Sequence, residues 1–264
     1  MIKFRILGSV EMCDQEGNSV DISGLQRRAL FALLLLNAGK TVSCEQLISE
    51  LWPSGVPSCG GNALQAHMTR LRRDLERCFG AEEAALRLPG SRSGYSVHVD
   101  PGELDLEVFN TLRSGAREIS ESDPAEAADM LRRALALWRG PALYDVRDRT
   151  SCLYAAALQE EEHYALTLEE LVELDLGQGK HEQLIGWLKA LTERYPYREK
   201  FFEQLIVALG RTGRKVEAAS LFRRMRSEMV EQFGVDPSPR LSRAVQRMLE
   251  DDLVVEGGFR SVEL

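Results

Sequence analysis

Apolar and polar positions alternate near the start of the chain. The alternation runs over Lys3–Leu7 and Val10–Met12. It returns over Ser19–Ile22, after the turn-like segment 14–18. A period of two is the pattern of a strand with one buried face. We therefore expect a small antiparallel sheet at the start of the chain.

The pattern then changes to that of a helix. Ser23 with Gln26 has the spacing of a capping box, which predicts a helix start. The run behind it continues to Ala38, and Gly39 is the expected stop. Because the run is apolar nearly all round, we expect this helix to be buried.

Two more helices are expected after the first. Ser43 with Gln46 is a second capping box, and the short helix behind it ends at Trp52. A third helix begins near Asn62 and continues to Arg77. Its apolar stripe, at steps of three and four residues, consists of Leu64, Met68, Leu71, Leu75 and Cys78.

Two short alternating runs close this part of the chain. Residues 86–88 and 95–99 are predicted as paired strands, with 89–94 as the turn between them. A small sheet, three helices and a hairpin in this order are typical of a winged helix.

From Glu103 onward the pattern predicts helices alone. The helices expected in the later part cover 151–176, 180–194, 198–211, 214–233 and 239–252. The segments that begin at Gly179 and Gly213 are similar and are offset by 34 residues, the period of tetratricopeptide helix pairs. Such pairs stack on one another and leave a concave surface for partners.

The predicted fold class is therefore α+β. Residues 1–102 are assigned to an N-terminal winged helix-turn-helix with a small antiparallel sheet and a wing hairpin. Residues 103–253 are assigned to an all-α, tetratricopeptide-like domain, and 254–264 to a flexible tail. The border follows a break in composition near Pro101-Gly102.

The net charge of −8 does not by itself suggest DNA binding, but it is unevenly distributed. Residues 1–102 carry eleven Lys or Arg and eleven Asp or Glu, and the rest carries 22 basic and 30 acidic side chains. Arg70, Arg72, Arg73 and Arg77 cluster on the third predicted helix. A local basic helix can bind phosphates in an acidic protein.

Several longer motifs resemble the Streptomyces antibiotic regulatory protein family over nearly the whole chain. They are Gln26–Leu30, Leu47–Trp52, Asn62–Arg73, Gly94–Tyr95, Ala134–Leu143 and Phe233–Pro239. The first four resemble OmpR-type winged helices, and the last two resemble the bacterial transcriptional activation domain of the family. The chain departs from the family pattern at Ser23-Gly24, where the start of the first helix is shorter, and in the wing turn at 91–93.

The resemblance implies a transcription activator of a secondary-metabolite, or antibiotic, biosynthetic gene cluster. A pair of protomers would bind direct repeats of double-stranded DNA near the promoter. They would recruit the RNA polymerase holoenzyme through its sigma factor and the C-terminal domain of its alpha subunit.

The third predicted helix is the candidate recognition helix. An α-helix fits the major groove, where Arg reads guanine and Gln reads adenine. Its candidate DNA contacts are Asn62, Gln65, His67, Thr69, Arg70, Arg72 and Arg73. The pattern leaves open which arginines would contact bases and which phosphates, and the alternative is a solvated basic face.

Further candidate DNA contacts lie outside this helix. Arg92 in the wing turn is a candidate for the minor groove or a phosphate, with a simple exposed turn residue as the alternative. Arg27, Arg28, Lys40 and Thr41 are candidate phosphate contacts near helix starts, with helix-end solvation as the alternative. Trp52 and Trp138 are interpreted as packing residues.

No catalytic, cofactor or metal motif occurs in the sequence. It has no phosphate-binding G-x-x-x-x-G-K-[ST], no H-E-x-x-H and no G-x-S-x-G, and its five cysteines include no C-x-x-C. We therefore expect neither an enzyme nor a cofactor. Because the chain has no signal-peptide pattern and no long apolar run, we expect a cytoplasmic, nucleoid-associated protein without membrane contact.

Two other classes of function stay open from the sequence. The protein could be a tetratricopeptide-type scaffold whose winged helix binds only protein. It could also respond to a small ligand in the helical domain, which a concave pocket with convergent polar groups would indicate. Repression by occlusion of a promoter is the alternative to activation.

Overall fold

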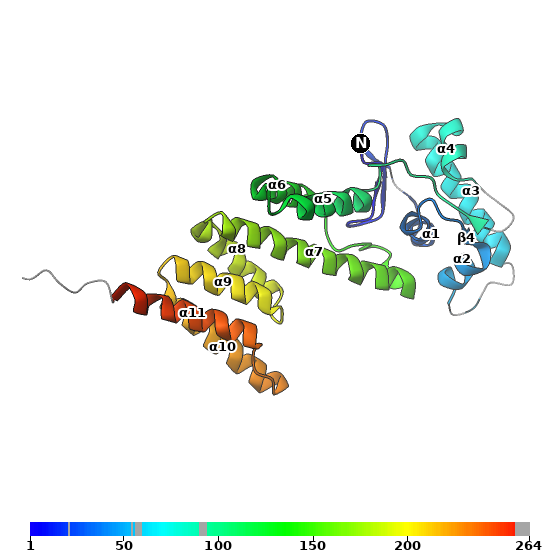
Figure 1. Ribbon diagram of the computed structural model, residues 1–264. Helices are drawn as coiled ribbons and strands as arrows, with labels where there is room; N and C mark the ends of the chain where they lie inside the picture. Colours follow the sequence, from blue (N-terminus) through cyan, green and yellow to red (C-terminus); the bar gives the residue numbers. More distant parts are fainter. Residues whose placement is uncertain (21, 54, 56–59, 90–93, 257–264) are drawn as a thin grey trace, which may run out of the picture. The chain divides into compact units, whose positions relative to one another are not determined.

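The computed structural model describes residues 1–20, 22–53, 55, 60–89 and 94–256 (Figure 1). The chain divides into two compact units. The first consists of residues 1–118 and 129–167, and the second of residues 119–128 and 168–264.

A three-stranded antiparallel sheet opens the first unit. Its strands are β1 (Phe4–Arg5), β2 (Glu11–Cys13) and β3 (Ser19–Val20), in that order. Phe4 pairs with Met12, which in turn pairs with Val20. Both Phe4 and Met12 are completely buried. The alternation of the sequence thus places one face of this sheet on the core, as predicted.

Three helices follow the sheet, with strand β4 (Val42–Ser43) before the second of them. The helices are α1 (Leu25–Leu36), α2 (Cys44–Leu51) and α3 (Gly60–Phe79), drawn in blue to cyan in Figure 1. Residues 29–35 of α1 are all buried, as its all-round apolar pattern predicted. The predicted apolar stripe of α3 is also buried, from Leu64 to Cys78.

The two predicted capping boxes have different outcomes. The Ser43 hydroxyl accepts a hydrogen bond from the backbone N–H of Gln46 at 3.1 Å, so the cap of α2 is confirmed. The cap predicted at Ser23 is wrong, because Gly24 is the N-cap of α1, with φ at 92°. The Gln26 amide instead donates to the carbonyl of Leu51 at 2.6 Å, which links the start of α1 to the end of α2.

The predicted strand at 86–88 is also wrong, because helix α4 (Ala81–Arg87) ends there. In α4, Glu83 and Arg87 stand four residues apart and form an ion pair, a spacing that brings side chains together only on a helix. Strand β5 (Gly94–Tyr95) pairs with β4 instead, with Tyr95 opposite Val42. The turn at 90–93, which includes Arg92, lies outside the described residues.

The first unit continues beyond the predicted winged helix. Helix α5 (Asp105–Ile119) follows β5, helix α6 (Pro124–Leu135) belongs to this unit from Asp129 onward, and the short helix η1 (Arg147–Arg149) follows later. The buried Asp105 carboxylate accepts the backbone N–H groups of Ile6 and Leu7 at 2.8–3.0 Å. The Leu143 N–H donates to the carbonyl of Ile6 at 3.0 Å. The loop after β1 is therefore held by residues from beyond position 102.

Two tryptophans were interpreted as packing residues. The Trp138 ring contacts the rings of Phe109 and Tyr164, with centroid distances of 5.5 and 4.7 Å. Trp52 is half-buried against the same core as α1 and α3. Both contacts agree with a role in packing.

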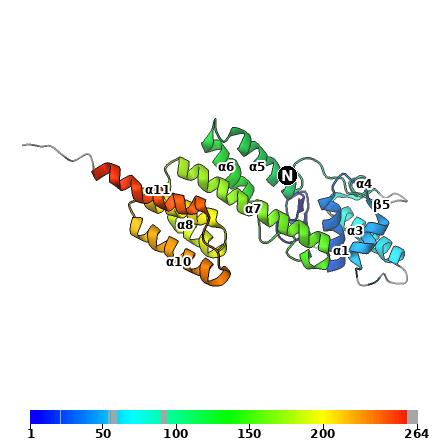
Figure 2. The same cartoon turned by 60° about the horizontal axis from the view of Figure 1, so that its bottom comes forward.

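Helices are the only regular elements among the described residues of the second unit. Helix α7 (Ser151–Gly177) belongs to it from Leu168 onward. The helices that follow are α8 (His181–Arg194), α9 (Glu199–Arg211), α10 (Lys215–Phe233) and α11 (Pro239–Glu256). Helix α9 packs against α8, α10 and α11, and it lies among them in Figure 1. Figure 2 shows α8, α10 and α11 from a second side.

The repeat offset by 34 residues in the sequence recurs in the backbone. Gly179 and Gly213 occupy equivalent turns and both have a positive φ, of 78° and 74°. The N–H of Lys180 donates to the carbonyl of Asp175, and the equivalent N–H of Arg214 donates to that of Leu209. A left-handed residue at these two turns favours glycine, which is why both repeats carry one.

Candidate nucleic-acid interface

The polar face of α3 is exposed because the opposite face is used for packing. Gln65, Thr69, Arg70 and Arg73 are all exposed and lie within slightly more than two turns of the helix. Asn62 lies in the first turn of the helix and is also exposed. The structure therefore brings five of the predicted recognition-helix residues to one exposed side.

Arg70 and Arg73 are the cations of this face. Among the described residues neither forms a hydrogen bond or an ion pair with another side chain. They line a shallow hollow with Arg27, Asp74, Glu76 and Arg77. Guanidinium groups that are exposed and unpaired suit phosphate or guanine oxygens, since both offer paired acceptors.

Arg72 has a different environment on the same helix. It is half-buried, and its guanidinium donates to the carbonyl of Leu88 at 2.9 Å. This bond ties α3 to the segment that leads into the wing turn. Arg72 thus has a structural partner that Arg70 does not have.

His67 lies at the edge of the exposed face. Its ring contacts the Trp52 ring, with centroids 6.1 Å apart, and its Nδ1 is buried without a hydrogen-bond partner. Burial lowers the pKa of His67, and the charges of Arg70 and Arg27 lower it further. A neutral imidazole at this place can donate or accept a hydrogen bond but adds no charge.

The two arginines predicted near the start of α1 form ion pairs. Arg27 Nη1 lies 2.6 Å from the Asp74 carboxylate, and Arg28 Nη1 lies 2.8 Å from that of Asp145. Neither carboxylate was part of the sequence prediction, because the partners are 47 and 117 residues away along the chain. No local signal could have identified them.

The last two predicted contacts lie in the loop between α1 and β4. Lys40 and Thr41 are both exposed there. Their backbone follows a turn in which the Lys40 N–H donates to the carbonyl of Asn37 at 2.9 Å. They are therefore accessible to a phosphate, on a different element from the residues of α3.

The described residues form neither a metal site nor a membrane span. No group of three His, Cys, Asp or Glu side chains among them could hold a metal ion. None of the helices in that part of the chain is long and apolar enough to cross a membrane. Cys13, Cys44, Cys78 and Cys152 are free thiols.

Comparison with known proteins identifies both parts of the chain. Residues 17–88 match the family model "Transcriptional regulatory protein, C terminal". Residues 104–249 match the model "Bacterial transcriptional activator domain". A winged helix of this type joined to such a domain defines a transcription regulator.

The chain belongs to the Streptomyces antibiotic regulatory protein family. It is 35% identical to Transcriptional regulator RedD of Streptomyces coelicolor over 97% of this chain and 72% of that protein. It is 33% identical to Regulatory protein DnrI of Streptomyces peucetius over 95% of this chain and 93% of that protein.

A solved structure has the same fold over nearly the whole chain. Mycobacterium tuberculosis EmbR, in complex with a low affinity phosphopeptide, superposes with a TM-score of 0.88 at 28% identity. The match covers 95% of this chain and 65% of the EmbR chain. The predicted winged helix followed by a helical domain is thereby confirmed.

Proposed function

We propose that this regulator activates transcription by binding DNA sequence-specifically through α3. The observation that carries the proposal is the division of α3 into two faces. Leu64, Met68 and Leu71 are buried on one side, while Gln65, Arg70 and Arg73 are exposed on the other. An amphipathic helix whose exposed face carries residues that read bases is suited to the major groove.

In this proposal, residues 1–102 supply the DNA contacts. Gln65, Arg70 and Arg73 enter the major groove, with Asn62, His67 and Thr69 beside them. Arg72 positions the helix through Leu88, and Lys40 and Thr41 contact a phosphate. Arg27 and Arg28 contact phosphates in addition to their carboxylate partners Asp74 and Asp145, and Arg92 contacts the DNA from the wing.

Residues 103–253 form the part that acts on the transcription machinery. Together with the tail it carries the whole net negative charge, so it gains nothing electrostatically from DNA. Its stacked helices offer surface to protein partners instead. We propose that a pair of protomers on direct repeats near the promoter of a secondary-metabolite gene cluster contacts RNA polymerase. The contacts are with the sigma factor and with the C-terminal domain of the alpha chain. The protein would then act at the nucleoid.

The DNA part of the proposal is tested by footprinting the full chain on a library of genomic DNA fragments. We expect a small set of protected sites, each with two tandem half-sites spaced by about one helical turn, roughly 10–11 base pairs. Insertion of half a turn between them should abolish cooperative binding. Failure to protect any DNA would favour a scaffold whose winged helix binds protein only.

The activation part is tested on a promoter identified in this way. Arg223, Arg226 and Glu228 are exposed on α10, so their substitution should leave the fold intact. Operator binding and in vitro transcription are measured together for each variant. We expect some variants that bind normally and fail to activate. If every activation defect follows a binding defect, or if the protein lowers transcription by occlusion, the proposed recruitment is wrong.

A further inference from the structure

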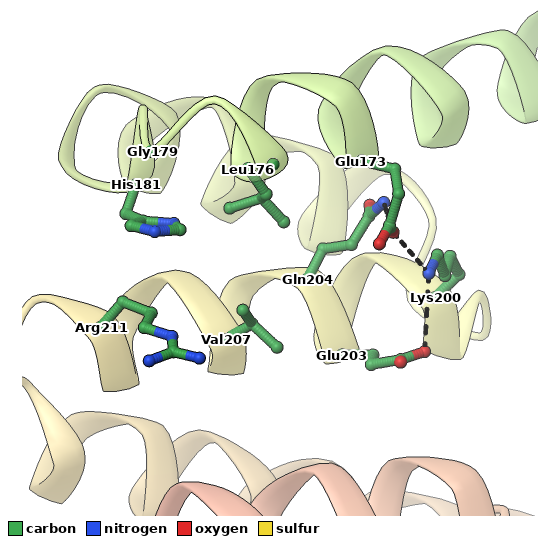
Figure 3. A pocket seen from close by; sticks show the side chains of 10 residues that line it. Glu173, Leu176, Gly179, His181, Lys200, Glu203, Gln204, Val207 and Arg211 are labelled. Atoms are coloured by element: carbon green, nitrogen blue, oxygen red, sulfur yellow. Dashed lines mark hydrogen bonds and ion pairs between the residues drawn. The ribbon is translucent and has the colours of Figure 1, made fainter. Parts of the chain in front are cut away.

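A polar pocket lies in the second unit, between the end of α7 and helix α9 (Figure 3). Its volume is about 430 Å³. The side chains that shape it are Glu173, Leu176, His181, Lys200, Gln204 and Arg211. The pocket is a concave site in which polar side chains converge, a feature that the sequence did not reveal.

One end of the pocket is electrically balanced. Lys200 Nζ lies 2.7 Å from Glu173 and 3.8 Å from Glu203, as the dashed lines in Figure 3 show. Arg240 also pairs with Glu203, at 2.8 Å. Although burial opposes ionisation of Glu173, the Lys200 ammonium holds the pKa of this carboxyl below its usual value. Two carboxylates and two cations therefore leave this end with no excess charge.

The opposite end carries a cation that has no counterion among the described residues. His181 and Arg211 face each other across the pocket in Figure 3. Within the described residues Arg211 has no ion pair, and Nδ1 of His181 is buried without a hydrogen-bond partner. A guanidinium beside a ring nitrogen is a suitable receptor for a carboxylate.

Between the two ends lies a buried acceptor that has no partner in the described part of the chain. Gln204 is only 1% exposed, and its Nε2 donates to the carbonyl of Glu169 at 2.9 Å. Its Oε1 is buried and accepts no hydrogen bond from the described part of the protein. A buried acceptor left unpaired costs free energy, which a ligand N–H would recover.

The pocket continues into a second hollow on the other side of α9. That hollow has a volume of about 640 Å³, and it shares Glu203, Val207 and Arg211 with the first. It adds Arg247, which is exposed, and the apolar Met248. The residues Glu203, Val207 and Arg211 of α9 separate the two hollows and line both of them. We call the two hollows together with these three residues the α9 groove, in which Arg247 adds a second cation to Arg211.

The dimensions of the groove favour an extended chain over a small acid. Gln204 and Arg211 are seven residues apart on one helix, a rise of about 10 Å. An extended peptide covers that distance with about three residues. A small dicarboxylate would fill only one end of the groove and would leave the Gln204 acceptor unpaired.

We propose that this groove binds an extended acidic peptide segment of a protein partner. A backbone N–H of the peptide donates to Gln204, and its carboxylates pair with Arg211 and Arg247. Its apolar side chains pack on Leu176, Val207 and Met248. The site is separate from α3, so this inference does not depend on the proposed DNA binding.

The test uses the full chain and a fluorescent ten-residue peptide of alternating Glu and Leu, followed by fluorescence anisotropy. The comparison peptide has Gln in place of every Glu. We expect the Glu peptide to bind at least tenfold more tightly, with affinity that falls as salt is added. Equal affinity of the two peptides, or no binding of either, would overturn the proposal.

Two pairs of variants localise the binding. Arg211→Gln should weaken binding of the Glu peptide about tenfold, whereas Arg224→Gln, at an exposed position on α10 outside the groove, should leave it unchanged. Val207→Glu should weaken binding, and Val207→Lys, which has a similar bulk, should not. Equal effects within either pair would contradict the assignment.

Succinate should fail to displace the peptide at millimolar concentration. Displacement at that concentration would overturn the proposal, because it would show a site for small acids.

Discussion

Arg27 of α1 and Asp74 of α3 form an ion pair, with Nη1 and Oδ2 2.6 Å apart. The Asp74 side chain is only 4% exposed, and it also pairs with Arg77 on its own helix. One buried carboxylate thus joins the candidate recognition helix to the buried helix α1. It also offsets part of the positive charge that the sequence places around α3.

The first prediction concerns the strength of this link. Asp74→Asn should lower the free energy of unfolding by about 2–3 kcal/mol, because hydrogen bonds to a charged group are lost in a buried place. Urea denaturation of both proteins checks this, provided that the dependence of the unfolding free energy on urea has the same slope in each. Glu76→Gln, at an exposed position of the same helix, should change the stability by less than about 0.5 kcal/mol. Equal stability of the two variants would show that the pair contributes nothing to the fold.

The second prediction separates Arg70 from Arg72. Arg70→Ala should leave stability unchanged and weaken operator binding by about 1–3 kcal/mol if Arg70 reads a base, with relaxed specificity at one position. A phosphate contact would instead weaken binding to all sequences and reduce the salt slope by about one. Titrations at several salt concentrations distinguish the two.

Arg72→Ala should act differently because its guanidinium already has a partner. Loss of the bond to the Leu88 carbonyl should cost about 1 kcal/mol of stability, together with weaker binding. Arg133→Ala, at an exposed position on α6, is the control for both variants. If Arg70→Ala and Arg72→Ala both bind the operator like the unchanged protein, α3 is not the recognition helix.

The third prediction is a pH dependence that arises at Glu103. Its carboxylate bonds to Arg87 at 2.6 Å and to Lys3 at 2.7 Å. Although burial opposes ionisation, these cations lower the pKa of Glu103 to about 2. The folded state therefore favours the ionised form, and the resulting stability is complete above the usual pKa of 4.5.

This contribution should disappear as the pH falls from about 4.5 toward 2. Glu103→Gln should cost about 3 kcal/mol of stability at pH 7, and the difference from the unchanged protein should narrow over that range. Glu82→Gln, at an exposed position in α4, serves as the control. A difference that stays constant with pH would mean that Glu103 acts by its shape and not by its charge.

The fourth prediction concerns the fragment 1–102. We expect it to fold and to bind DNA alone, but more weakly than the full chain. In the full chain the N–H groups of Ile6 and Leu7 bond to Asp105, and Arg28 pairs with Asp145. The fragment lacks both carboxylates, so it should unfold at a lower urea concentration.

A longer fragment, 1–167, restores both carboxylates and is the matched comparison. It should recover most of the stability lost by 1–102. If 1–102 is unfolded, or is folded but does not bind DNA, the proposed border at residue 102 between a DNA-binding part and a helical part is wrong. In that case the part up to Thr167 would be the smaller folding unit.

The sequence by itself determined the elements whose signals are local. The stripe from Leu64 to Cys78, the Ser43 cap and the two turns at Gly179 and Gly213 each depend on residues within one or two helical turns. Hydrophobic periodicity, helix caps and glycines at positive φ are set by near neighbours along the chain. They can therefore be recognised from the sequence before the tertiary structure is known. The family motifs then placed these elements in the order of a winged helix and a helical repeat.

The tertiary structure decided what depends on distant partners. Gln26 has capping-box spacing, but its side chain donates to the carbonyl of Leu51. The segment 86–88 alternates like a strand, but α4 extends to Arg87, which pairs with Glu83 and Glu103. Only the fold shows that Arg27 and Arg28, predicted as phosphate contacts, also pair with Asp74 and Asp145. The groove at Arg211 likewise exists only because α7, α9 and α11 are brought together. Charge pairing and burial depend on distance in space, and the spacing of residues along a chain does not fix that distance.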